Sequence, residues 1–138
     1  MARRSPLHAV SMDDLEAAYR AWPAPEHEKT RLRALLLRIR LERLVDRLPT
    51  TVCRQVRGKV APRLLLSVGE DGLTPDGQAR RHRVVTTAVA AYRELCDFLH
   101  ARRPDLHVSV QDVASWEAAV AAIEAELACH TPSPRSVA

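Results

Sequence analysis

The stretch from Glu26 to Leu48 reads EHEKTRLRALLLRIRLERLVDRL, and it decides most of what the sequence predicts about the fold. Leucine, isoleucine and valine recur in it every three or four residues, which is the spacing of a helix with one apolar side. Pro25 and Glu26 suit the first turn of that helix, and Pro49 ends it. Basic residues recur near one another along the same stretch. We therefore predict a long helix over residues 25 to 48, with a broad apolar band and a basic stripe on its other side.

Charge is distributed unevenly along the chain. Residues 29 to 63 hold eleven basic side chains and two acidic ones, a net charge of +9, whereas residues 104 to 130 hold five acidic side chains and no Lys or Arg. Such a separation of sign is typical of a protein with a polyanionic or acidic partner, although a charged helix face in contact with water is the alternative. Nineteen of the 21 basic residues are arginine, which the codon bias of a GC-rich genome would also produce.

Length and composition predict a helical protein with a single core. The chain has 138 residues, of which 46% are hydrophobic and 28% charged, and this is ordinary for one folded domain. No apolar run approaches the roughly 18 residues that span a bilayer, so we expect a cytoplasmic protein that does not contact a membrane. The three cysteines, Cys53, Cys96 and Cys129, are far apart in sequence and are expected to be reduced thiols.

Shorter segments flank the long helix. Ser11 can cap a first helix that ends before Pro23, and Thr50 can cap a short helix over residues 50 to 57. The apolar run from residue 64 to 68 precedes a Gly-rich turn at residues 69 to 72, which is the pattern of a strand and its turn. We therefore expect at most one small β-hairpin.

The C-terminal half predicts two more helices. Thr74 and Pro75 suit the N-cap and the first position of a long helix that runs toward Pro104, and Ser109 can cap the last one. Apolar residues step by three and four along both, so the two helices should form a long antiparallel hairpin. The predicted fold is mostly α, with five helices in a single domain. Its predicted parts are a flexible start (1–10), the domain (11–130, with a helix-turn-helix-like part at 29–73 and the hairpin at 75–129) and a disordered tail (131–138).

The basic helix, its tight turn and the short helix after it resemble a helix-turn-helix. In that motif the second helix presents its N-terminal side chains to base edges in the major groove, while flanking cations hold phosphates. The chain would then bind double-stranded DNA. The predicted nucleic-acid-binding residues are Arg40, Arg43, Arg47, Thr50, Thr51, Arg54, Gln55, Arg57, Lys59 and Arg63.

The segment Leu73-Thr-Pro-Asp-Gly77 resembles the Leu-Thr-Pro-x-Gly stretch that closes the wing of MarR-type winged-helix regulators and opens their dimerisation helix. The resemblance implies a homodimeric transcriptional regulator with residues 64 to 73 as its wing and residues 75 to 129 as its dimer helices. The chain departs from the family in having one helix fewer before the wing and an acidic wing tip. A local role of Thr74 and Pro75 as a helix start stays open. The implied dimer interface comprises Val85, Tyr92, Leu95, Leu99, Trp116 and Val120.

Metal ligation and catalysis receive less support from the sequence. Cys96 and His100 lie one helical turn apart and could begin a metal site. The predicted hairpin, however, places Cys129 about 18 Å from Cys96. Near Cys129 and His130 the only further candidate ligand is His82, which is too few for a strong site. These side chains are expected to be structural, and the aromatic residues Trp22, Tyr92 and Trp116, which lie on the apolar stripes, are expected to belong to the core. No nucleophile with a base and no phosphate-binding loop is evident, so we predict a protein that is not an enzyme and has no cofactor or metal.

Two hypotheses for the function follow. The first is a nucleic-acid-binding protein, a small dimeric regulator of winged-helix type. The second is a non-enzymatic helical adaptor or assembly protein whose Arg-rich face docks an acidic protein surface. Both assign the binding to the basic segment between Lys29 and Arg63.

Overall fold

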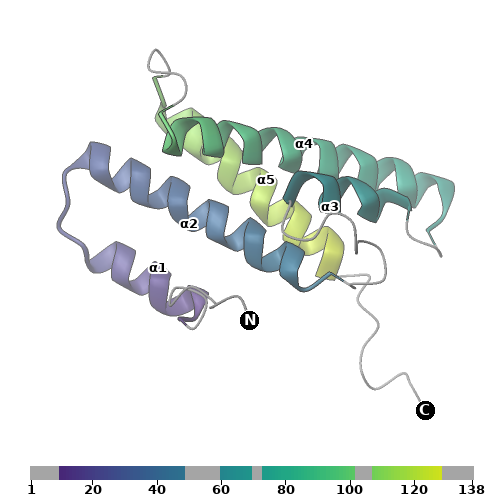
Figure 1. The fold of residues 1–138 in the computed structure, drawn as a ribbon, viewed down its shortest axis with the longest axis horizontal. Coiled ribbons are helices and arrows are strands. Elements are labelled where there is room, and N and C mark those ends of the chain that lie inside the picture. Colours follow the sequence, from purple (N-terminus) through teal and green to yellow (C-terminus); the bar gives the residue numbers. More distant parts are fainter. Residues whose placement is uncertain (1–9, 49–59, 70–72, 102–106, 129–138) are drawn as a thin grey trace.

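The computed structural model describes residues 10–48, 60–69, 73–101 and 107–128, and these residues form five α-helices and no β-strand. The prediction of a mostly α fold is confirmed. The helix α2 lies between α1 on one side and the pair α4 and α5 on the other (Figure 1). None of the described helices is long and apolar enough to cross a membrane. The helices are α1 (Met12–Ala21), α2 (Glu26–Asp46), α3 (Val60–Leu66), α4 (Pro75–Leu99) and α5 (Val110–Ala128).

Three predicted helix starts are confirmed by their capping bonds. The backbone N–H of Asp14 donates to Ser11 Oγ at 3.1 Å, and that of Gly77 donates to Thr74 Oγ1 at the same distance. Ser109 and Asp112 form a reciprocal pair, because Ser109 Oγ accepts the N–H of Asp112 while the Asp112 carboxylate accepts the N–H of Ser109. Each cap satisfies a backbone donor that has no partner within its helix, so these short local signals fix where the helices begin.

The predicted strand over residues 64 to 68 is wrong. This segment lies in α3 and in the 3-10 turn Ser67–Gly69 that follows it. Val60, Leu64 and Ser67 are buried at the spacing of a helix, and Ser67 Oγ donates back to the carbonyl of Leu64 at 2.6 Å. Pro62 is tolerated because it stands in the first turn, where its missing N–H is not needed. A short run of leucines does not distinguish a strand from a buried helical turn.

The helix α2 buries two opposite faces. Leu37 is fully buried in the main core and Ile39 is 8% exposed, yet two residues differ by 200° around a helix and so point in nearly opposite directions. Leu37 packs toward α4 and α5, whereas Ile39 lies on the side that α1 covers. The predicted single apolar band is therefore two bands, and the arginines lie on the flanks between them.

The helices α2, α4 and α5 enclose the main core, with α3 at one end (Figure 1). The helices α4 and α5 run antiparallel, as predicted, and Trp116 Nε1 donates to Glu94 Oε2 at 2.7 Å across their interface. At the other end of the same hairpin Arg80 contacts Glu126. Three predicted segments lie outside the described residues. They are the flexible start, of which only residue 10 is described, the helix over residues 50 to 57 and the disordered tail over residues 131 to 138.

The pair Leu37 and Leu35 offers a matched test of this packing. Leu37→Ala should lower the free energy of unfolding by about 2–5 kcal/mol, because it leaves a cavity in the core. Leu35→Ala, at a position that is 38% exposed, should cost less than about 1 kcal/mol. Denaturant unfolding followed by circular dichroism measures both. Equal losses for the two variants would contradict the arrangement of α2.

Candidate functional site

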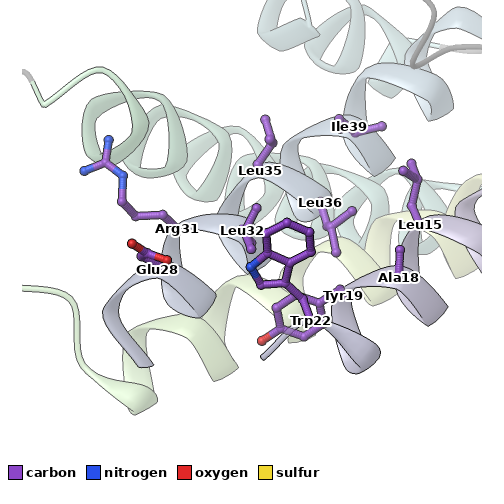
Figure 2. A pocket seen from close by; sticks show the side chains of 10 residues that line it. All are labelled: Leu15, Ala18, Tyr19, Trp22, Glu28, Arg31, Leu32, Leu35, Leu36 and Ile39. Atoms are coloured by element: carbon purple, nitrogen blue, oxygen red, sulfur yellow. The ribbon is translucent and has the colours of Figure 1, made fainter. Parts of the chain in front are cut away.

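A groove between α1 and α2 is the candidate site. Its volume is about 500 Å³, and its lining side chains come from facing sides of the two helices (Figure 2). Eight of the ten are apolar or aromatic, and the two charged ones, Glu28 and Arg31, both belong to α2. The lining residues are Leu15, Ala18, Tyr19, Trp22, Glu28, Arg31, Leu32, Leu35, Leu36 and Ile39. The groove is therefore suited to an apolar surface rather than to a polar small molecule.

The apolar lining is only partly covered. Leu36 and Ile39 are buried at the base of the groove, whereas Leu35 is 38% exposed and Trp22 is 57% exposed. The helix α1 contributes no buried residue of its own. The interpretation of Trp22 as a core residue is wrong because α1 ends at Ala21, which leaves the indole at the end of a helix. Trp116, by contrast, is 3% exposed and is confirmed as part of the core.

One side of α1 is held against the bundle by polar contacts. Arg33 Nη1 donates to Glu16 Oε1 at 2.6 Å, and Arg33 Nε donates to Glu117 Oε1 at 2.5 Å, so a single guanidinium joins α1 to α5. Lys29 and Arg33 also lie over the ring of Tyr19, at 5.6 Å and 5.7 Å from its centroid. These contacts hold one edge of the groove and leave the opposite edge of α1 exposed.

The ion pairs between α2 and α5 follow one register. Arg33 contacts Glu117 and Arg40 contacts Glu124, so both pairs join residues separated by 84 positions. The seven-residue spacing on each helix places the two pairs two turns apart on parallel neighbours. Burial acts to lower the pKa of Arg33, but hydrogen bonds and charges from Glu16 and Glu117 outweigh it and raise that pKa above its ordinary value. Carboxylates of the same chain thus neutralise Arg33 and Arg40 of the basic stripe.

The predicted nucleic-acid-binding residues lie only partly within the described chain. Arg40 is half-buried and bound to Glu124, and Arg43 lies half-buried one turn further along α2. Arg47 is exposed at the end of α2, with its Nε donating to the carbonyl of Arg43 at 3.3 Å. Arg63 belongs to α3. The other predicted residues, Thr50, Thr51, Arg54, Gln55, Arg57 and Lys59, lie outside the described residues.

The residues of the implied dimer interface pack within one chain. Val85, Leu95 and Val120 are fully buried, and Trp116 is nearly so, in the main core. Tyr92 and Leu99 are partly buried against the same core. Their side chains fill the space between α4, α5 and α2 of a single copy. The large apolar side chains that are exposed among the described residues are instead Val10, Trp22, Leu35, Leu65 and Val110, and two of them, Trp22 and Leu35, line the groove.

A polar cluster on α2 and α4 contains the cysteine considered for metal binding. Arg38 Nη1 lies 3.2 Å from His100 Nε2, and Arg38 Nε donates to Glu42 at 2.8 Å. Burial, followed by a hydrogen bond with Cys96, raises the pKa of Tyr92 to about 12. The positive guanidinium of Arg38 beside the His100 ring disfavours the binding of a metal cation at that ring. The described residues contain no group of three or more His, Cys, Asp or Glu side chains that could hold a metal ion.

A buried ion pair joins α4 to α5 at the far end of the bundle. Arg81 is fully buried, its Nε lies 3.4 Å from Glu126 Oε1, and its Nη1 donates to the carbonyl of Ser67 at 3.3 Å. Arg80 Nε donates to the other oxygen of Glu126 at 3.1 Å. Burial acts to raise the pKa of Glu126, but the two arginines outweigh it and hold that pKa below its ordinary value of 4.5.

This depressed pKa predicts a pH-dependent contribution to stability. Because the carboxyl of Glu126 ionises more readily in the folded state, its contribution is complete above pH 4.5 and is lost as the pH falls through the lowered pKa. The difference in unfolding free energy between the parent and Glu126→Gln should therefore shrink on acidification below pH 4.5. Urea unfolding at several pH values measures it. A difference that stays constant down to pH 2, about two units below the ordinary carboxyl pKa, would contradict the ionic contact.

Comparisons with known proteins identify no relative. No protein-family model, curated protein or solved structure matches this chain significantly.

Proposed function

We propose that this protein is a non-enzymatic helical adaptor or assembly protein that binds another protein through the groove between α1 and α2. The observation that carries the proposal is the second apolar face of α2, which α1 covers only in part. Trp22 at 57% exposure and Leu35 at 38% lie on this surface beside the buried Leu36 and Ile39. Exposed apolar surface that is contiguous in this way is typical of interaction sites.

The shape of the groove favours a helical partner. Two antiparallel helices with apolar side chains between them form a trough, and an amphipathic helix can lay its apolar side into such a trough. The lining includes the aromatic residues Tyr19 and Trp22 and the edge residue Arg31. Tryptophan, tyrosine and arginine are the side chains that contribute most often to binding energy at protein interfaces.

The Arg-rich stripe of α2 is less suited to dock an acidic partner. Arg33 and Arg40 already bind carboxylates of α1 and α5, and a partner would have to displace Glu16, Glu117 and Glu124 to reach them. Exchanging one ion pair for another of the same kind yields little free energy, since exposed pairs are worth about 0–1 kcal/mol. The apolar groove requires no such exchange, so it supports adaptor function better.

Site-specific photo-crosslinking in cells tests the adaptor proposal. A benzophenone amino acid at Ala18, an exposed residue that lines the groove, should form adducts with a protein, because a docked partner would lie within reach of it. The same probe at Ala90, an exposed residue of α4, is the matched control and should form few adducts. If position 18 gives no more protein adducts than position 90, the groove is not a docking surface.

Nucleic-acid binding is the second candidate, and one observation favours it. From Arg43 to Arg63 the sequence holds six basic residues and one acid, beyond the part of α2 where Arg33 and Arg40 meet their carboxylates. A regulator that binds DNA through this segment would contact phosphates with those cations. Two features agree with the resemblance to MarR-type regulators: the helix start at Thr74 and Pro75, and the helical hairpin that follows it. This candidate function does not include a wing strand over residues 64 to 68, because that segment is helical.

Salt dependence and charge reversal test this second candidate. Affinity for random duplex DNA, measured by fluorescence anisotropy, should fall log-linearly with salt, with a slope of about −0.9 for each phosphate contacted. The double variant Arg54→Glu, Arg57→Glu should abolish binding. The matched control reverses Arg20 and Arg93, two exposed arginines outside the segment, and should retain most of it. Equal losses in both double variants would show that only net charge matters.

A further inference from the structure

We propose that the partner in the α1–α2 groove is a second copy of this chain, which presents its own α1 and α2 face to face in a two-fold dimer. This inference rests on the proposed function, since it names the occupant of the same groove. The two helices form an outer layer of the molecule, with α4 and α5 on the far side of α2 (Figure 1). Two such layers stacked together make an antiparallel four-helix arrangement, which is a common way for helical layers to bury apolar faces.

The two-fold axis runs parallel to the helices. Rotation about such an axis keeps every residue at its height along the bundle and places α1 of one copy over α2 of the other. Within one chain Glu16 contacts Arg33, so these two residues are at the same height on antiparallel helices. Because the two helices run in opposite directions, a position two residues before Glu16 on α1 is level with a position two residues after Arg33 on α2. Asp14 is therefore at the height of Leu35. By the same count Ala18 is at the height of Arg31.

The facing edges are complementary in size and charge. The open edge of α1 carries the exposed residues Asp14 and Ala18, one helical turn apart. The open edge of α2 carries Arg31 and Leu35, also one turn apart. In the dimer Ala18 of one copy packs against the aliphatic stem of Arg31 of the other copy. The guanidinium of that Arg31 extends one turn along the interface to the carboxylate of Asp14. Leu35 of the same α2 enters the groove between α1 and α2 of the first copy. The contact occurs twice, because the two-fold repeats it.

The charges at the groove edge are compatible with this pairing. Arg31 has five N–H donors, of which one donates to the carbonyl of Leu99 at 3.3 Å, and the guanidinium carbon lies 5.6 Å from the centroid of the Phe98 ring. Glu28 is at the height of Ala21 on the facing helix, by the same count as above, so it meets no charge there. The dimer therefore pairs the acid of one α1 with a base of the other α2 and brings no like charges together at those heights.

A second copy is also an occupant that would cover the exposed side chains of Trp22 and Leu35 with a single contact. One isologous contact covers Trp22 and Leu35 of both copies, so each copy supplies the apolar surface that the other needs. The lining of α2 from Glu28 to Ile39 extends over about 16 Å of helix. This contact is at the small end of specific interfaces, so we expect a reversible dimer that depends on concentration.

Sedimentation velocity of the full chain across about a hundredfold range of concentration tests this inference. The parent should shift with concentration from 15.4 kDa toward twice that mass. Leu35→Asp should remain a monomer throughout. Leu65→Asp is the matched control, because Leu65 is 46% exposed on α3 outside the groove, and it should dimerise like the parent. Circular dichroism verifies that each variant is folded. A monomeric parent at every concentration, or equal effects of both substitutions, would overturn the dimer.

A charge exchange tests the orientation. Asp14→Arg and Arg31→Asp should each weaken the dimer at least about tenfold, because each places like charges one helical turn apart across the interface, and does so twice. The double variant restores opposite charges and should recover most of the affinity. Failure of the double variant to exceed either single one would contradict the proposed facing of α1 and α2.

The photo-crosslinks from Ala18 separate this inference from the proposal on which it rests. An adduct of twice the monomer mass that contains only this chain supports both. An adduct with a different protein, together with a monomeric parent in sedimentation, overturns the dimer and leaves the adaptor function standing. No protein adduct from position 18, together with a monomeric parent in sedimentation, overturns the docking surface and the dimer together.

Discussion

The double-sided burial of α2 is the constraint on which the rest of the structure depends. A helix that carries Leu37 on one side and Ile39 on the other cannot satisfy both by packing on a single neighbour, because each apolar side chain must leave water. The pair α4 and α5 covers one side and α1 covers the other (Figure 1). The arginines are thereby confined to two narrow flanks, where they meet the edges of the neighbouring helices.

This confinement explains the distribution of charge along the sequence. The basic helix α2 and the acidic helix α5 are parallel neighbours, and Arg33 and Arg40 contact Glu117 and Glu124 at one constant offset. Ion pairs of this partly exposed kind add little stability, but a mismatch of one turn would separate them, so they favour one register. Part of the charge asymmetry that indicated an external polyanion is thus satisfied inside the chain.

The groove follows from unequal coverage of the two sides of α2. The far side is packed by two long helices, whereas the near side has only the ten residues of α1. A single helix, held at one edge through Glu16, leaves part of the apolar surface between Glu28 and Ile39 uncovered, and it exposes Trp22 where it ends. The short α1 thereby combines a structural role, through Glu16 and Tyr19, with an exposed edge at Asp14 and Ala18 that a partner can reach.

Local signals in the sequence were sufficient for most helix boundaries. Ser11, Thr74 and Ser109 predicted three helix starts because a capping side chain acts within one turn and requires no tertiary contact. The same locality explains the error at residues 64 to 68, since the burial of Leu64 against other helices decided between strand and helix there. The groove could be found only in part from the sequence. Leu32, Leu36 and Ile39 repeat with helical spacing, but this spacing does not separate them from the core residues of the same helix.

The sequence by itself determined that the chain is mostly helical, where its principal helices begin, and that bases and acids occupy different segments. Only the tertiary structure decided which apolar side of α2 forms the core, which carboxylates Arg33 and Arg40 contact, and where apolar surface remains exposed. The physical reason is range. Capping and helical periodicity act within a few residues, whereas burial and ion pairing depend on helices that are up to 84 residues apart in the chain.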